Sequence, residues 1–184
     1  MICEIDYSKS TIANLVLLSI FLIFAVFLKI YYIYADNSSL RWILFPTTII
    51  VSLFSGIHFY FIDNVGYTSF NGFYVINKTC AGLNFLIIIF TLSIVLIFRI
   101  REKVINNLFI FLTLLLSCFV LTIIANSSRI YSSIFIEMIK HQLPFLKSSK
   151  NWFHEAMGIV IFFSYLLLYY FIIKRVKKWM EQKK

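Results

Sequence analysis

Residues 86–98 read LIIIFTLSIVLIF, an apolar run that contains no charged side chain. With its flanking residues the run reaches the roughly 20 residues that a helix needs to cross a bilayer core. Because lipid offers no hydrogen bonds to the backbone, only helices or closed barrels cross it. The runs in this chain are too continuous for the alternating strands of a barrel. The sequence therefore predicts an all-α, polytopic transmembrane helical bundle with about five spans, at 11–34, 41–62, 80–100, 104–125 and 153–174.

The composition of the whole chain excludes an ordinary soluble domain. Hydrophobic residues make up 61% of the 184 residues, and charged residues make up 14%. Average soluble domains are about 45–50% apolar even with glycine counted. No repeat, low-complexity stretch or composition shift divides the chain, so residues 1–184 are predicted to form one integral membrane domain. The formal net charge of +9 sits largely beside the apolar runs, which favours a topogenic role over binding of nucleic acid.

The positions of the basic residues predict an orientation. Cytoplasmic loops of membrane proteins are enriched in lysine and arginine. If the five spans alternate, the basic clusters next to spans two, three, four and five fall on one side: Arg41, Arg99, Arg101, Lys103, Lys174, Arg175, Lys177 and Lys178. The prediction is a multi-pass protein of the cell inner (plasma) membrane with a cytoplasmic C-terminus and an outer N-terminus. Lys29 is then expected to extend toward the cytoplasmic surface.

The connection 126–152 contains an amphipathic stretch, residues 132–146. It mixes apolar side chains with Glu137, Lys140 and His141, a pattern typical of a helix that lies in the membrane interface. We therefore expect a possible sixth helix there.

The predicted topology brings chemically active residues to the outer face. Cys80 begins span three, Asn126 and Arg129 follow span four, and His154 begins span five. Residues far apart in the chain are thus predicted to meet at one membrane depth, on the extracytoplasmic side.

These residue types fit acyl transfer. A helix N-terminus favours an anion and lowers the pKa of a cysteine placed there, so Cys80 is the candidate nucleophile. His154 suits the role of general base and acid, and Arg129 that of oxyanion stabiliser. Asn126, one turn before Arg129, is expected to orient it, and Gly82 to let a substrate backbone approach.

Plainer interpretations exist for each of these residues. Cys80 can be a packing residue or pair with Cys3, Arg129 can be an interfacial anchor, and His154 can pair with Glu155. His58, near the outer end of span two, is a rival base or a substrate-binding residue. Cys118 lies inside an apolar run and is expected to pack. The cysteines show no metal-ligand spacing, and neither a metal nor another cofactor is predicted.

Three segments carry a resemblance to a known family: TCAGLNF at 79–85, ANSSR at 125–129 and HEAMG at 154–158. In their order and in their placement between spans they resemble the signature segments of the exosortase/archaeosortase family. The resemblance covers about residues 75–174. The small number of spans is most similar to the compact branch called exosortase K, and Ala81 stands where serine is common in the family.

The resemblance implies a membrane-embedded cysteine protease or transpeptidase with Cys80 as nucleophile, His154 as proton shuttle and Arg129 as transition-state stabiliser. It implies substrates that are membrane-anchored proteins with a C-terminal motif, a transmembrane helix and a basic tail. Cleavage at the motif and transfer to a cell-envelope acceptor would complete protein sorting, or hydrolysis would replace the transfer.

Two other functions stay open at this point. The chain can be a non-enzymatic membrane subunit or assembly factor whose Arg129 and His154 bind lipid headgroups or a partner. A small transporter is less favoured, because the spans hold few polar groups near their centres and no paired broken helices.

Overall fold

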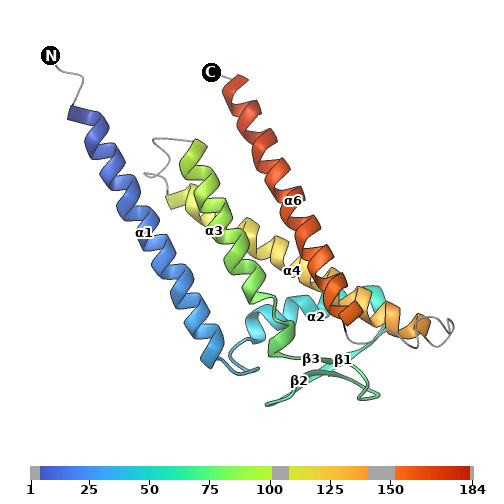
Figure 1. Cartoon of the computed structure of the whole chain (residues 1–184). Coiled ribbons are helices and arrows are strands. Elements are labelled where there is room, and N and C mark those ends of the chain that lie inside the picture. Colours follow the sequence, from blue (N-terminus) through green and yellow to red (C-terminus); the bar gives the residue numbers. More distant parts are fainter. Residues whose placement is uncertain (1–4, 101–107, 141–151, 183–184) are drawn as a thin grey trace. The chain divides into compact units, whose positions relative to one another are not determined.

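The protein is described from a computed structural model, which gives the backbone of residues 5–100, 108–140 and 152–182 and the side chains of residues 18–96, 112–139, 156–175 and Lys178. Its helices are α1 (Ile5–Tyr34), α2 (Arg41–Ser55), α3 (Leu83–Ile100), α4 (Leu108–Lys140) and α6 (Trp152–Gln182) (Figure 1). Each predicted segment overlaps one of these helices, and α1, α4 and α6 extend beyond the predicted bounds. Three apolar helical stretches of the described chain, Lys78–Leu96, Leu112–Ile139 and Ala156–Arg175, are long enough to cross a bilayer. The predicted class, a helical membrane protein, is confirmed.

The chain forms two compact units. The first comprises Met1–Tyr34, Leu83–Val120 and Tyr169–Lys184, and the second comprises Ala35–Gly82 and Leu121–Leu168. Helices α4 and α6 each contribute to both units, and each unit is described by itself.

In the first unit, α1 and α3 pack side by side and antiparallel (Figure 1). The rings of Phe21 and Phe24 lie edge-on to Phe90, with centroid distances of 6.3 and 5.8 Å. Farther along α1, Lys29 Nζ donates a hydrogen bond to Asn84 Oδ1 at 2.7 Å. The last turns of α1 therefore lie beside the first turn of α3. This arrangement contradicts the predicted placement of Lys29 at the membrane face opposite to the start of span three.

In the second unit, α2 is shorter than the predicted span 41–62. Gly56 ends it with a left-handed φ of +69° and donates its N–H to the carbonyl of Ser52 at 2.9 Å, a common way to stop a helix. Residues 59–62 then leave the helix and form a strand. Apolarity alone does not distinguish such a short strand from the end of a helix.

Three short strands follow α2 and form an antiparallel sheet that the sequence pattern did not predict. They are β1 (Phe59–Ile62), β2 (Gly66–Ser69) and β3 (Val75–Ile76), in the order β1-β2-β3. Phe59 lies opposite Ser69, and Tyr67 lies opposite Ile76. The chain thus reaches the nucleophile candidate through a sheet and not through a plain loop.

Helix α4 is longer than the predicted span 104–125, since it runs unbroken for 33 residues. Residues 132–140 of the expected interfacial helix continue α4, and residues 141–146 lie outside the described chain. No glycine or proline interrupts 108–140. The hydroxyls of Ser128 and Ser133 donate to the carbonyls of Ile124 and Arg129, each at 2.9 Å, so these polar residues do not break the helix.

Candidate active site

Cys80 ends a short 3₁₀ helix, η1 (Lys78–Cys80). Asn77 caps it, because its Oδ1 accepts hydrogen bonds from the backbone N–H and the hydroxyl of Thr79 at 3.1 and 2.7 Å. The N–H of Cys80 donates to the carbonyl of Asn77 at 2.8 Å. The Cys80 side chain is half-buried and forms no disulfide with the other described cysteine, Cys118, and Cys3 lies outside the described residues. The Sγ of Cys80 lies 3.9 Å from the Thr79 hydroxyl.

This placement corrects one part of the sequence argument. Span three was expected to begin at Cys80, but α3 begins at Leu83. Cys80 therefore precedes the helix instead of occupying its first turn, and the helix N-terminus acts on the thiol less directly than predicted.

Gly82 joins η1 to α3 and has a left-handed φ of +69°. A Cβ at this residue would lie 2.9 Å from Cγ of Asn126, closer than real contacts allow. The absent side chain thus makes room for Asn126. The expected role of Gly82, room for a substrate backbone, is not what the described contacts display.

Asn126 connects the candidate nucleophile, Cys80, with the candidate oxyanion stabiliser, Arg129. It is fully buried in α4, and its Nδ2 donates a hydrogen bond to the backbone carbonyl of Cys80. Its Oδ1 accepts from Nε and Nη2 of Arg129, each at 3.3 Å. The predicted orientation of Arg129 by Asn126 is therefore present, and the same carboxamide also holds the Cys80 segment.

Arg129 is half-buried between α4 and α6. Its Cζ lies 5.6 Å from the ring centroid of Phe162, which favours the cation. A Cβ on Gly158 would lie 3.2 Å from Cδ of Arg129, so this glycine lets the arginine stem pass close to α6. Within the described part of the chain, the acceptor of the guanidinium hydrogen bonds is the neutral amide of Asn126.

His154 lies in the first turn of α6, and its side chain lies outside the described residues. Gly158 and Phe162 follow it at intervals of four residues, and residues four apart share one face of a helix. Gly158 and Phe162 both contact Arg129. His154 therefore belongs to the face of α6 that meets Arg129, one turn nearer the start of the helix.

His58 is exposed and precedes β1 in a segment without regular secondary structure. It does not lie within a helix, as the prediction of span two required. No hydrogen bond joins it to Cys80, Asn126 or Arg129 among the described residues. The structure brings three predicted site residues together, places His154 on the matching helix face and leaves His58 aside.

Sequence reasoning missed several residues that hold the site. Gly158 and Phe162 cradle Arg129, and the hydroxyl of Ser127 donates to the carbonyl of Thr47 at 3.3 Å, which ties α4 to α2. Gly158 closes the segment HEAMG, so its distance of one turn from His154 was a usable signal. Phe162 and Thr47 lie in apolar runs that contain many similar residues and gave none.

These features define a helical membrane protein in which a cysteine just before α3 is linked to a buried asparagine and an arginine within α4. The family model described as Transmembrane exosortase matches residues 7–171, which is most of the chain. The chain belongs to the transmembrane exosortase family. No curated protein and no solved structure matches it.

Proposed function

We propose that this protein is a membrane-embedded cysteine transpeptidase that cleaves the C-terminal sorting signal of membrane-anchored proteins. The observation that carries the proposal is the double role of Asn126. One buried carboxamide binds the backbone of Cys80 and the guanidinium of Arg129. Residues 46 positions apart in the sequence are thereby held as one constellation, in a chain of the exosortase family.

The reaction begins at Cys80. His154 takes the thiol proton, and the thiolate attacks the scissile carbonyl of the substrate. Arg129 stabilises the negative charge that develops on the carbonyl oxygen. The C–N bond then breaks, His154 gives its proton to the leaving amine, and a thioester on Cys80 remains. A nucleophile of the cell envelope attacks the thioester and releases the thiol; water in its place gives hydrolysis.

Among the residues whose side chains are described, the hydrogen-bond acceptor for Arg129 is neutral, and this supports the assignment. A carboxylate beside the guanidinium would cancel part of its charge, whereas the amide of Asn126 orients the fork and leaves the charge intact. Charge-assisted hydrogen bonds from arginine are roughly twice as strong as neutral ones. Arg129 is therefore suited to a developing oxyanion.

The substrates in this proposal carry a short motif, a transmembrane helix and a basic tail, and the enzyme resides in the inner (plasma) membrane with its site on the extracytoplasmic face. The dense basic clusters at 99–103 and 174–178 support a cytoplasmic location of the opposite ends of α3 and α6. Membership of the compact exosortase K branch stays a prediction.

The experiment is a comparison of Cys80→Ala with Cys118→Ala in the source cells. Proteins that end in a motif, an apolar helix and a basic tail are tagged, and their membrane-bound and processed forms are separated by mass. With Cys80→Ala the unprocessed form should accumulate, while Cys118→Ala should process normally. Normal amounts of both variants in the membrane fraction serve as the control.

Unchanged processing with Cys80→Ala would contradict the proposal and favour a membrane subunit or assembly factor. Such a protein depends on its surface and not on one thiol.

A further inference from the structure

The segment that contains α2 and β1 begins and ends at neighbouring positions in the second unit. Asn37, just before α2, donates through Nδ2 to the carbonyl of Asn64, just after β1, at 2.8 Å. The same side chain accepts at Oδ1 from the N–H of Lys78 at 2.6 Å. One side chain therefore joins the start of α2, the end of β1 and the helical turn that carries Cys80. Such a closed path does not take the chain across a membrane.

An independent contact in the first unit agrees. Lys29 and Asn84 place the end of α1 beside the start of α3, two residues after Gly82. If α1 and α3 cross the membrane as antiparallel neighbours, the chain between them starts and finishes on one side. In the five-span topology these two ends face opposite sides.

The length of α2 points the same way. Its 15 residues rise about 22 Å at 1.5 Å per residue. The hydrocarbon core is about 30 Å thick. Helix α2 is too short to cross it without help.

The sheet restricts the tilt of α2. The Cζ of Arg41, at the start of α2, lies 4.8 Å from the ring centroid of Phe61 in β1, and Phe45 lies 6.4 Å from Tyr67 in β2. Because only three residues separate the end of α2 from β1 and Phe61 lies beside Arg41 at the start of the helix, the strand runs back along the helix. Open sheet edges do not occur in contact with hydrocarbon, so the sheet lies along the membrane surface. Helix α2 runs alongside β1, so it lies along the membrane surface as well.

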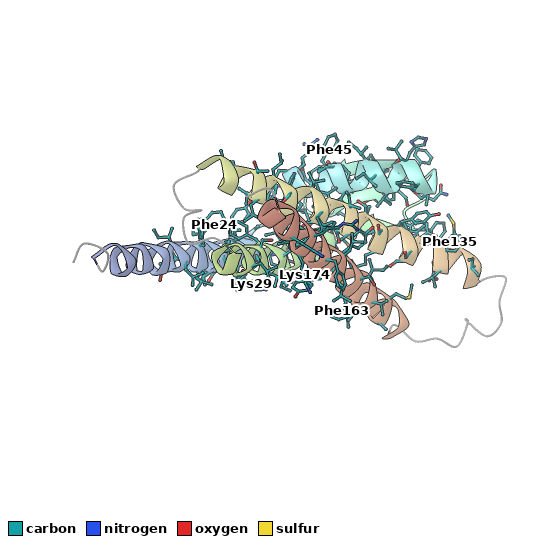
Figure 2. The ribbon with its side chains drawn as sticks, turned by 90° about the horizontal axis from the view of Figure 1, so that it is seen from above. Phe24, Lys29, Phe45, Phe135, Phe163 and Lys174 are labelled. Atoms are coloured by element: carbon teal, nitrogen blue, oxygen red, sulfur yellow. The ribbon has the colours of Figure 1, made fainter. Side chains whose placement is uncertain are left out.

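The outward face of α2 is apolar and has no unsatisfied hydroxyl. Leu53 and Phe54 are 76% and 71% exposed, and Phe45 stands at the outer edge of α2 (Figure 2). Every hydroxyl of the helix donates to a backbone carbonyl at 2.7 to 2.8 Å, from Thr47, Thr48, Ser52 and Ser55. None of these groups requires water. In a protein of a transmembrane family, lipid acyl chains are the environment that suits such an apolar face.

We propose that α2 is a monotopic helix whose outward face, with Trp42, Phe45, Ile49, Leu53 and Phe54, binds the acyl chains of a single leaflet on the Cys80 side. The chain then crosses the bilayer four times, through α1, α3, α4 and α6.

Both termini lie on the side opposite Cys80 in this topology. Helix α1 extends about 36 Å from Lys29 back to Ile5, and α6 extends about 36 Å from Gly158 to Gln182. Both lengths exceed the hydrocarbon core. Arg41 moves from the cytoplasmic side, where five alternating spans placed it, to the side of Cys80.

Cysteine accessibility separates the two topologies. In a full-length chain whose native cysteines are replaced by serine, single cysteines are introduced by Ser8→Cys, Ser38→Cys and Lys183→Cys. A membrane-impermeant maleimide is added to intact spheroplasts and to permeabilised ones. Four crossings predict labelling of Ser38→Cys in intact spheroplasts and of the two terminal variants only after permeabilisation. Labelling of Ser38→Cys on the same side as Lys183→Cys, with Ser8→Cys opposite, would overturn the proposal.

Tryptophan quenching tests the lipid contact in a chain that keeps its cysteines. Single tryptophans at residues 42, 49 and 54 are compared in vesicles of phosphatidylcholine brominated at different depths. The control is Leu168→Trp on the exposed face of α6, which should be quenched at the bilayer centre. A monotopic α2 gives three matching shallow profiles. A deep profile at residue 49 alone contradicts the proposal, and so does the absence of quenching at all three residues. Absence of quenching together with crosslinked dimers would assign the face to another copy of the chain.

Discussion

Cys118 is part of α4, and Cys80 is joined to α4 by the hydrogen bond from Asn126. The surroundings of the two cysteines differ. Cys118 is fully buried in the first unit. Its Sγ lies 3.3 Å from the hydroxyl of Ser93 and 3.6 Å from that of Tyr169, and Ser93 donates to Tyr169 at 2.9 Å. Cys80 is half-buried, and the second unit holds it by its backbone, through Asn77 and Asn126.

The Cys118 thiol packs in the interior of its unit, whereas the Cys80 thiol is partly exposed. Side-chain hydrogen bonds join α3, α4 and α6 through Cys118 and occupy its sulfur. Backbone hydrogen bonds fix the position of Cys80, and its sulfur makes one long contact, 3.9 Å, with the Thr79 hydroxyl. Variants around Cys80 should therefore affect substrate processing, and variants around Cys118 should affect stability.

Among the residues linked to Cys80 through Asn126, the largest effect is expected from Arg129→Ala. Loss of one oxyanion donor typically costs about 2.7–4 kcal/mol, or about 10²–10³ in rate. Pulse-chase processing of a tagged substrate measures it. Arg129→Lys keeps the charge but lacks the planar fork, and it should recover only part of the rate. Full activity of Arg129→Ala would remove the guanidinium from the chemistry.

Asn126→Ala should have the next largest effect, because it removes all three hydrogen bonds of the carboxamide. A buried group left without its partner costs about 1–3 kcal/mol, and the rate of processing should fall roughly in proportion, by about 10–100-fold. Asn126→Asp keeps an acceptor for Arg129 but loses the donor to the Cys80 carbonyl. If Asn126→Asp were fully active, the bond to Cys80 would have no role in catalysis.

Gly82→Ala tests the close packing between the Cys80 segment and α4. Gly82 and Gly72 have nearly equal φ values of +69° and +71°. A Cβ at Gly72 meets nothing within 4 Å, whereas one at Gly82 meets Asn126 at 2.9 Å. Both variants carry backbone strain of order 1–3 kcal/mol, so both should lower the temperature of thermal denaturation in detergent. Only Gly82→Ala should also slow processing; equal processing rates would mean that Asn126 moves without consequence.

Cys118→Ala should give the smallest effect on function. Loss of its contacts with Ser93 and Tyr169 is expected to lower the free energy of unfolding by about 1 kcal/mol, seen as a lower denaturation temperature in detergent. Processing of substrate should match that of the wild type at a temperature where both are folded. A large loss of processing would mean that the two cysteines are not separate in function.

The sequence predicted the helices well where apolar runs are long. Residues 80–100 and 153–174 largely overlap α3 (Leu83–Ile100) and α6 (Trp152–Gln182), because an unbroken apolar run of that length has one stable form in lipid. The predicted helix ends at residues 62 and 125 were wrong, because helix ends depend on local geometry. Gly56 stops α2 early by adopting a positive φ, and the serines after Asn126 bond within the helix and let α4 continue.

The candidate site was predictable in part for similar reasons. Cys80, Asn126 and Arg129 carry chemistry that is visible in their side chains, and the structure joins them. The roles of Gly82 and Gly158 arise only from what lies opposite them, Asn126 and Arg129. The side on which α2 lies depends on hydrogen bonds of Asn37 and Lys29, which no count of charges reveals.

The central claim is that Cys80 forms a covalent intermediate with a substrate inside the constellation held by Asn126. The direct measurement is mass spectrometry of the protein isolated from cells with a tagged substrate, after breakdown of the thioester is slowed by removal of the acceptor. We predict a substrate fragment joined to Cys80 and released by hydroxylamine, as expected of a thioester, with none on Cys118. Continued substrate processing by Cys80→Ala, with no adduct on Cys80 in the wild type, would contradict the account.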